Sequence, residues 1–257
     1  MWAITNLSAH SSLPLQPGAY DLLVVDEASQ ADIASVIPLL YRSQRAMIVG
    51  DPMQLSHVTG IDQRTDAALL TRHKLTADAF QRFSYRVNSL YDMAASAPTL
   101  DGGPILLDQH YRCHPSIAEY ASTSFYSGAL HVWTNGRRWA VPQGHKAGVA
   151  WTNVSGGIDG SGGSGAVSMP EVQEVSRLLQ QMAAANFKGT VGVVTPFKRQ
   201  ANRLRDALEN AIDEDTRHIW ALRVGTAHAF QGDERDVIVV SLCCGADMSA
   251  GTRSFVT

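Results

Sequence analysis

Two short apolar runs, each followed by an acid, most constrain how this chain folds. The runs 22–25 and 46–49 lead into Asp26 and Asp51, and the residues between the runs are enough for a crossover helix. That pattern is typical of a βαβ unit, which builds a parallel sheet. Ligands bind at the carboxyl ends of parallel strands. Asp26, its neighbour Glu27 and Asp51 are therefore expected at a ligand-binding edge.

Strands and helices alternate along the rest of the chain, which predicts an α/β fold with a second parallel sheet. We expect strands at 2–6, 105–107, 150–154, 191–194, 222–226 and 237–242. We expect helices at 77–97, 115–126, after a capping box at 168–171, and after Phe197, with a loop at 57–76 and a Gly-rich loop at 156–165. The stretch 99–104, with two Gly and an Asp, predicts a hinge between a first domain at 1–98 and a second at 99–257.

Composition excludes several classes of protein. The chain has a net charge of −3 and is 45% hydrophobic, which is ordinary for a globular domain. No apolar run approaches the roughly 18 residues of a membrane span, and the N-terminus does not have the pattern of a signal peptide. The three cysteines have no metal-ligand spacing and are expected to be reduced thiols. We expect a cytoplasmic protein without a membrane partner, with a nuclear location left open.

The acids themselves suit phosphoryl transfer. Asp26 can hold Mg²⁺ through its water shell, and Glu27 can orient or deprotonate an attacking water. Gly50 permits a tight turn before Asp51, and Gln54 suits a sensor of a terminal phosphate. The structural alternatives are an acid pair that caps a helix and an ordinary turn at the end of a strand.

Five segments in order resemble the motifs of superfamily 1 helicases, in the branch that contains the nonsense-mediated-decay helicases. Any one of them could arise by chance, but the five together cover nearly the whole chain. They are Asp26-Glu27-Ala28-Ser29-Gln30, Gly50-Asp51-Pro52-Met53-Gln54-Leu55, Gln109-His110-Tyr111-Arg112-Cys113-His114-Pro115, Thr195-Pro196-Phe197 with Gln200, and Thr226-Ala227-His228-Ala229-Phe230-Gln231-Gly232-Asp233-Glu234. The resemblance implies two RecA-like domains of the P-loop NTPase type, the first of them partial.

The resemblance also implies roles in binding and hydrolysing Mg-ATP. Asp26, Glu27, Gln54 and Arg112 would be catalytic, with Arg112 as an arginine finger, which suits an Arg because its charge is fixed and its donors are forked. The nucleotide-binding positions would be Asp51, Gln109, Tyr111, Gln231, Gly232 and Glu234. The alternatives are a surface salt bridge for Arg112, an ordinary buried position for Tyr111 and a pair with Arg235 for Glu234.

The second domain would also hold single-stranded DNA or RNA. The resemblance places Thr195, Pro196, Thr226 and His228 at strand ends, where hydroxyl and backbone N–H groups contact a strand without reading its bases. A loop histidine satisfied by local hydrogen bonds is an equally good interpretation of His228.

Two elements of such a motor are absent from these 257 residues. No G-x-x-x-x-G-K-[ST] phosphate loop precedes Asp26, and Gly251-Thr252-Arg253-Ser254 does not match the motif that follows in the family. We therefore expect a fragment of an ATP-dependent helicase that is inactive alone and needs an N-terminal Walker A portion, in cis or in trans.

Two other functions remain open from the sequence. The first is a non-catalytic nucleic-acid-binding or interaction module that keeps the fold and has lost the motor. The second is a Mg²⁺-dependent nuclease that uses Asp26, Glu27 and Asp51, which is weaker because the motifs account for these acids without cleavage.

Overall fold

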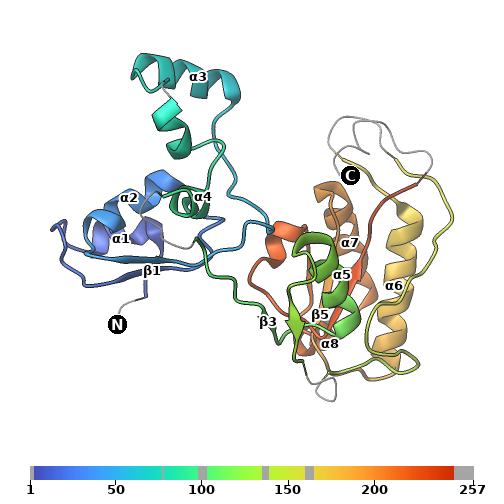
Figure 1. The fold of residues 1–257 in the computed structure, drawn as a ribbon. Coiled ribbons are helices and arrows are strands. Elements are labelled where there is room, and N and C mark those ends of the chain that lie inside the picture. Colours follow the sequence, from blue (N-terminus) through green and yellow to red (C-terminus); the bar gives the residue numbers. More distant parts are fainter. Residues whose placement is uncertain (1–2, 77, 98–102, 135–138, 160–164, 246–257) are drawn as a thin grey trace. The chain divides into compact units, whose positions relative to one another are not determined.

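The computed structural model describes residues 3–76, 78–97, 103–134, 139–159 and 165–245. It divides into two compact units, Met1–Leu107 and Asp108–Thr257, coloured blue to green and green to red in Figure 1. We expected the boundary at 98/99; residues 98–102, which include most of the expected hinge, lie outside the described residues. Each unit is described below by itself.

The first unit is built on a pair of parallel strands, as the opening pattern predicts. Strand β1 pairs with β2 in the register Leu23↔Ala46 to Val25↔Ile48, and α2 crosses between them. The elements of this unit are α1 (Asn6–Ser12), β1 (Leu23–Val25), α2 (Ile33–Tyr41), β2 (Ala46–Ile48), α3 (Gln63–Arg72), the 3₁₀ helix η1 (Asp78–Phe83) and α4 (Leu90–Ala95).

The core of the first unit lies between β1 and the helices α2 and α4. Val25, Val36, Leu39 and Leu90 are buried there. A buried Arg42 closes α2, because its guanidinium donates to carbonyls in the loop after α1 and to one near the end of α2 itself. Burial of these apolar groups stabilises the strand pair that carries the acids.

Three expectations for residues 1–97 are wrong. The expected strand at 2–6 gives way to α1, which begins at Asn6 because Thr5 caps it, and Trp2 lies outside the described residues. The expected loop at 57–76 contains α3, which buries no residue and so shows no apolar period. The expected helix at 77–97 is two helices, since Ser89 and Asp92 form a capping box that starts α4 afresh.

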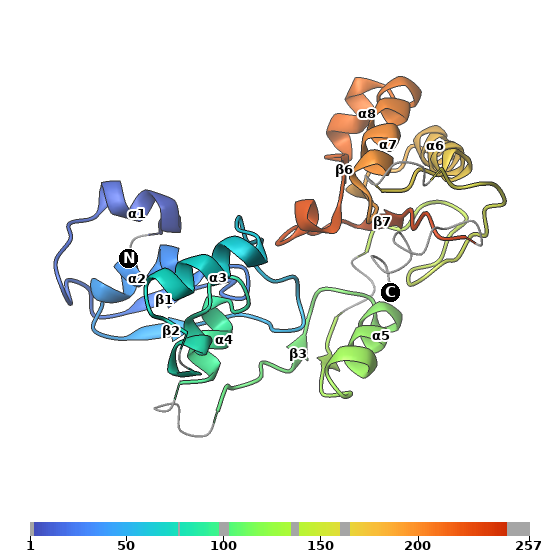
Figure 2. The same ribbon diagram turned by 90° about the horizontal axis from the view of Figure 1, so that it is seen from above.

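The second unit contains a three-stranded parallel sheet in the order β6-β5-β7. Strand β5 is central in this sheet. Helices α6 and α7 pack against one another (Figure 2). The elements here are α6 (Met169–Ala184), β5 (Val191–Val194), α7 (Lys198–Ala211), α8 (Glu214–Ile219), β6 (Arg223–Gly225), the 3₁₀ helix η3 (Ala227–Phe230) and β7 (Val237–Val240). The expected strands at 191–194, 222–226 and 237–242 and both long helices are confirmed, and α8 was not expected.

The core of this unit follows the apolar period of its two long helices. Val172, Leu179, Leu204 and Leu208 pack with β5 and with Trp220, whose indole N–H donates to a backbone carbonyl. Ser168 caps α6 by accepting from the backbone N–H of Glu171, but the reciprocal bond of the expected capping box does not form, because the Ser168 N–H donates to Gln200.

A short parallel pair completes the second unit. Strand β3 (Gln109–His110) pairs with β4 (His131–Val132), and α5 (Pro115–Phe125) lies between them in sequence. The expected strand at 105–107 is wrong, because these residues pair with nothing in the described sheets and Ile105 is 90% exposed. The expected strand at 150–154 is also wrong, since that exposed segment forms no ladder.

Candidate functional site

The acids of the first unit lie at one edge of its sheet. Val25 and Ile48 are register partners at the ends of β1 and β2, so the residues that follow them emerge at the same carboxyl edge. Asp26 follows β1 directly, is exposed, and accepts a hydrogen bond at Oδ1 from the backbone N–H of Glu27 (2.9 Å). Asp51 follows β2 by way of Val49 and Gly50. This edge can therefore present carboxylates to a magnesium–phosphate ligand.

The backbone at Glu27 adopts a conformation that few L-residues take. Its φ is +52°, in the left-handed region. Its carboxylate Oε2 accepts a hydrogen bond from the side-chain amide of Gln30 (2.8 Å). Gln30 therefore fixes the direction of the Glu27 carboxylate, a role that no spacing in the sequence indicated.

The turn after β2 is organised by the Asp51 side chain. Its Oδ1 accepts from the backbone N–H of Met53 (3.0 Å), and its Oδ2 accepts from the side-chain amide of Gln54 (2.9 Å). Such bonds from an Asp to the residues that follow are typical of Asx turns. Gln54 is thus held by Asp51 and is exposed beside it.

Ser29 ties the two acidic segments together, and sequence reasoning missed it. It is buried, its hydroxyl accepts from the backbone N–H of Asp51 (3.2 Å), and its carbonyl accepts from the backbone N–H of His57 (3.1 Å). Gly50 is required beside it, since a Cβ there would lie 2.9 Å from the Ser29 nitrogen and 3.0 Å from a Tyr91 ring carbon. The only signal for these contacts in the sequence was that Ser29 and Gly50 each belong to one of the helicase-like motifs.

Arg112 and Glu234, predicted to face the nucleotide, meet in the second unit. Arg112 Nε lies 2.5 Å from Glu234 Oε1. The alternative pair of Glu234 with Arg235 does not form; Arg235 contacts Asp233, as does Arg223 at 2.9 Å. Arginines on both sides lower the pKa of Asp233, chiefly through the hydrogen bond from Arg223.

The segment around Arg112 presents an aromatic side chain at the surface. Tyr111 is exposed, unlike an ordinary buried tyrosine, and its hydroxyl donates to Gln109 Oε1 (2.5 Å). His110 Nε2 accepts from the backbone N–H of Cys113 (2.8 Å). Burial, and then the charge of Arg112, lower the pKa of His110, which favours the neutral ring that can accept this bond.

The carboxyl edge of the second sheet carries the residues predicted to hold a strand. Thr195 and Pro196 follow β5, and Thr226 and His228 follow β6, with His228 exposed. Thr195 is fully buried, so its hydroxyl is not exposed to a strand, and its Oγ1 accepts from the backbone N–H of Phe197 (3.5 Å). Thr195 therefore stabilises the turn from inside and does not present its hydroxyl at the surface.

The turn after η3 holds the remaining predicted nucleotide contacts. Gln231 is half-buried, and Gly232 adopts a φ of +72° with open space where a Cβ would lie. An L-residue is strained at that φ, which accounts for a glycine there. The turn leads directly to Glu234.

A buried polar network underlies this edge and was not predicted. The Gln200 side chain donates to the Ser168 carbonyl (3.2 Å) and to Ser241 Oγ (3.0 Å), and accepts from the Ser168 N–H (3.0 Å). Ser241 donates to Glu171 Oε2 (2.6 Å), which also accepts from the Cys243 N–H (3.1 Å). The network therefore fixes the first turns of α7 and the segment after β7 against the start of α6.

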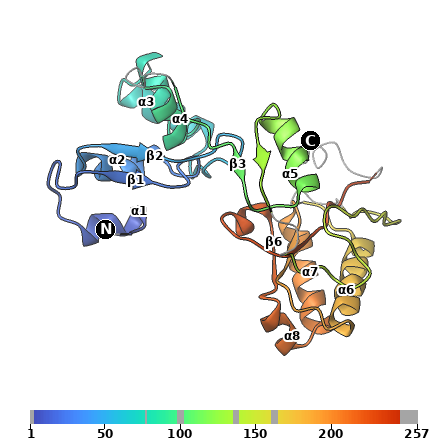
Figure 3. The same ribbon diagram turned by 60° about the horizontal axis from the view of Figure 1, so that its bottom comes forward.

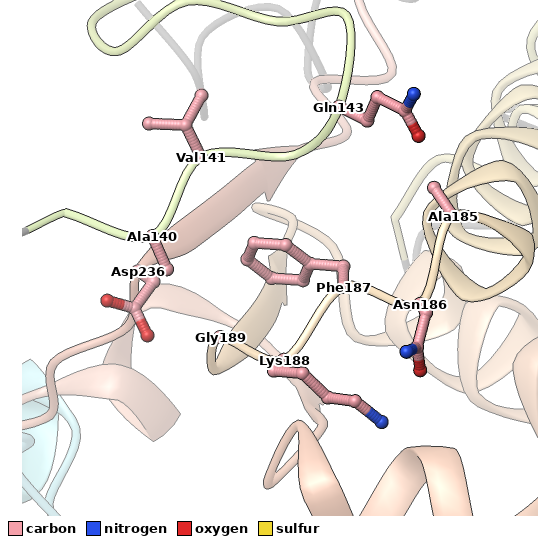
Figure 4. Close-up of a pocket in the computed structure, with 9 residues that line it drawn as sticks. All are labelled: Ala140, Val141, Gln143, Ala185, Asn186, Phe187, Lys188, Gly189 and Asp236. Carbon is pink, nitrogen blue, oxygen red and sulfur yellow. The ribbon is translucent and has the colours of Figure 1, made fainter.

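A shallow pocket of about 520 Å³ lies at the opposite edge of the same sheet (Figure 4). Its lining includes Phe187, Lys188 and Gly189 before β5 and Asp236 before β7. These residues mark the amino ends of the strands, and none of the predicted site residues lines the pocket. The pocket is therefore separate from the candidate site.

The donor set suits magnesium rather than a metal held by protein ligands alone. Within the described ranges, no group of three or more His, Cys, Asp or Glu side chains is arranged to hold a metal ion. Mg²⁺ commonly keeps several waters and binds one or two carboxylates together with substrate phosphates. The exposed Asp26 carboxylate fits that requirement.

Two family models match the chain, each described as an AAA domain, over residues 4–59 and 87–255. Helicase SEN1 of Saccharomyces cerevisiae is 25% identical over 97% of this chain, and the 5'-3' DNA helicase ZGRF1 of Mus musculus is 27% identical over 86%. The Regulator of nonsense transcripts 1 homolog of Neurospora crassa is 25% identical over 85%.

The chain spans only a small part of these relatives, 11% of the first two and 19% of the third. None of the helices in the described part of the chain is long and apolar enough to cross a membrane. The parallel sheets, the order of the motifs and the match of an AAA-domain model to residues 87–255 agree, and the chain belongs to the superfamily 1 helicases, in the group that includes the regulators of nonsense transcripts.

Proposed function

We propose that this chain is part of an ATP-dependent helicase or translocase that couples ATP hydrolysis to movement on DNA or RNA. One observation carries the proposal. The Asp26-Glu27 segment and the Asp51–Gln54 turn share the carboxyl edge of β1 and β2, and the Ser29 hydroxyl bonds one segment to the other. A degenerate module has no physical need for this arrangement of acids.

The first unit would supply the hydrolytic residues. Glu27, held by Gln30, accepts a proton from the water whose oxygen attacks the γ-phosphorus, while the bond from that phosphorus to the β–γ bridging oxygen breaks. Asp26 would hold a hydrated Mg²⁺, which neutralises charge on the phosphates. Gln54 changes partner from Asp51 to the terminal phosphate.

The second unit would supply the stabilising charge. Arg112 donates to the γ-phosphate and spreads the charge that develops there, an effect worth about 10³–10⁵ in rate in related reactions. Tyr111 packs on the adenine. Gln231, Gly232 and Glu234 face the nucleotide, with Gln109 and Asp51 as further contacts.

Single-stranded DNA or RNA would bind at the carboxyl edge of the second sheet. Thr226 is half-buried and precedes η3 without a side-chain capping bond, while His228 is exposed two residues later. Pro196 restrains the adjacent turn, which the buried Thr195 supports from inside. Contacts of this kind hold a phosphate backbone without reading bases.

Hydrolysis needs a cradle for the β- and γ-phosphates. The 257 residues contain no G-x-x-x-x-G-K-[ST] loop. We propose that a Walker A portion acts with this chain in cis or in trans, and we expect negligible ATPase activity from the 257-residue chain by itself.

The test compares ATP hydrolysis by the purified chain with hydrolysis after a phosphate-loop portion is supplied. We expect Mg²⁺-dependent activity only in the second case, abolished by Glu27→Gln and reduced at least about a hundredfold by Arg112→Ala. Glu119→Gln on the exposed surface of α5 is the matched control. Robust hydrolysis by the 257-residue chain, lost in Glu27→Gln, would overturn the requirement for a separate cradle.

A second candidate is a non-catalytic nucleic-acid-binding module. This module would bind single strands in a salt-sensitive way, indifferent to ATP, and would gain no hydrolysis when a phosphate loop is supplied. The same experiment separates the two.

A further inference from the structure

One segment of the first unit lies outside both family models. The matches cover residues 4–59 and 87–255, which leaves 60–86 between them. In the structure this segment contains α3 and η1 and follows the Asp51–Gln54 turn closely along the chain. The assignment of the chain to its family therefore does not account for these residues.

The helix α3 has no cover within the unit. It buries no residue, and Figures 1 and 3 show it standing away from β1 and β2. An isolated ten-residue helix is marginal in water. Asp62 supports its first turn by accepting from the backbone N–H and the hydroxyl of Thr65 (2.8 and 3.1 Å).

The segment is nevertheless anchored at its base. The His57 ring bonds through Nε2 to the Tyr85 carbonyl (2.6 Å), and the Asn88 amide donates to the Gln81 carbonyl (2.9 Å). Ser84 is buried between them in sequence. The segment is therefore held beside the loop that follows Gln54 and is not a free linker.

Charge divides the surface of α3. Arg64 and Arg72 are eight residues apart and share a face with Ala68, whereas Asp66 lies on the opposite face at about 100° per residue. Lys74 follows the helix end and is exposed. Residues 60–86 hold five basic side chains against three acidic ones, a net +2 in a chain of net −3, the basic ones being Arg64, Arg72, Lys74, Arg82 and Arg86 and the acidic ones Asp62, Asp66 and Asp78.

Exposed aromatic rings accompany this charge. Phe80 and Phe83 in η1 are 40% and 43% exposed, and the Arg82 guanidinium lies over the Phe83 ring at 4.6 Å. Rings that stack with bases and cations that hold phosphates are the combination used to bind single strands without sequence preference.

We propose that residues 60–86 form an accessory single-strand-binding surface on the first unit. The basic face of α3 with Lys74 holds phosphates, and Phe80 and Phe83 stack with bases. The inference rests on the proposed function only for the class of partner, nucleic acid. It adds a contact apart from the proposed strand contacts at Thr226 and His228.

The test measures binding of the 257-residue chain to a fluorescein-labelled 20-nucleotide oligo(dT) or oligo(U), by anisotropy at several salt concentrations. The charge variant Arg64→Gln/Arg72→Gln/Lys74→Gln is compared with the control Lys146→Gln/Arg177→Gln/Lys188→Gln, which removes the same charge from the second unit. Because α3 buries nothing, the charge variant should unfold at the same urea concentration as wild type.

We expect at least a tenfold loss of affinity in the charge variant at about 50 mM salt. The slope of log affinity against log salt should fall by about 2, since each single-strand phosphate contact contributes about 0.7. The control should change affinity by less than about twofold. Phe80→Ala/Phe83→Ala should weaken binding and leave the salt slope unchanged, because stacking releases no counterions.

Equal weakening in the charge variant and the control would overturn the proposal, as would wild-type binding in both the charge and the aromatic variants. In the latter case the segment faces a protein partner or solvent.

If His228→Ala abolishes binding while the charge variant binds normally, the accessory surface is wrong and the proposed strand site is supported. Binding lost only in the charge variant supports the accessory surface and argues against the contact at His228. No binding by wild type overturns both.

Discussion

Arg112 Nε and Glu234 Oε1 are 2.5 Å apart, joining the turn after β3 to the turn after η3 within the second unit. Both side chains are well exposed, at 56% and 63%. Solvent screens such a pair, so it stabilises the fold little. Arg112 is therefore held in a defined direction yet can exchange Glu234 for a phosphate at small cost.

Glu234→Gln should change the free energy of unfolding by less than about 1 kcal/mol, because exposed ion pairs contribute about that much or less. Urea denaturation of the chain measures this change, and a double-mutant cycle with Arg112→Gln isolates the pair itself. Glu174→Gln, which breaks the exposed pair with Arg177, is a matched comparison. A loss above about 2 kcal/mol would mean that the pair is structural and not exchangeable.

Ser89→Ala should destabilise the first unit by about 0.5–2 kcal/mol, the usual cost of removing an N-cap. Ser89 is buried, accepts from the Asp92 N–H (3.2 Å) and donates to its carboxylate (2.6 Å). Thermal unfolding followed by circular dichroism measures the effect. Ser96→Ala, an exposed position beyond the same helix, is expected to change little, and equal effects at the two positions would refute a capping role.

Gln200→Leu should destabilise the second unit by about 1–3 kcal/mol for each buried group that it leaves unpaired. The side-chain amide of Gln200 forms hydrogen bonds with Ser168 and Ser241, and all three residues are buried. Urea denaturation measures the loss. Gln180→Leu on the exposed face of α6 controls for the substitution itself, and a stability equal to wild type in Gln200→Leu would show that the network is dispensable.

The Cys243 thiol should resist alkylation at pH 8, where the exposed Cys244 reacts. Burial, and then the carboxylate of Glu171, raise the pKa of Cys243 to about 12. An unfolded cysteine has a pKa of about 8.5, so the folded state holds this proton more tightly. The resulting stability is complete below about pH 8.5 and is lost as the pH rises towards 12.

Mass spectrometry of iodoacetamide-treated peptides measures the reactivity of the two thiols, and urea denaturation from pH 7 to pH 10 measures the linkage. Cys243→Ala should make stability fall less steeply above about pH 8.5. Labelling of Cys243 as fast as Cys244 in the folded protein would contradict the burial of its thiol.

The candidate site could be read only in part from the sequence. Asp26, Glu27 and Asp51 were placed at a shared strand edge because strand ends are local features, and the register of β1 and β2 brings them there. The bond from Asp51 to Ser29 joins residues 22 positions apart, and no local pattern reports such a partner. For the same reason the burial of Thr195 was missed.

The sequence by itself determined the elements that bury an apolar face. Strands β1, β2, β5, β6 and β7 and helices α2, α6 and α7 lie where apolar runs or helical spacing predict them, because burial imposes the period that a reader detects. Three features became visible only in the tertiary structure. Helix α3 forms without packing against the unit, and a new helix, α4, begins after Ser89. The strand lies at Gln109–His110 and not at the exposed residues 105–107. The uncovered α3 and the short α4 leave no long apolar period to read, although their capping bonds are local, and the strand at Gln109–His110 depends on partners 22 residues further along the chain.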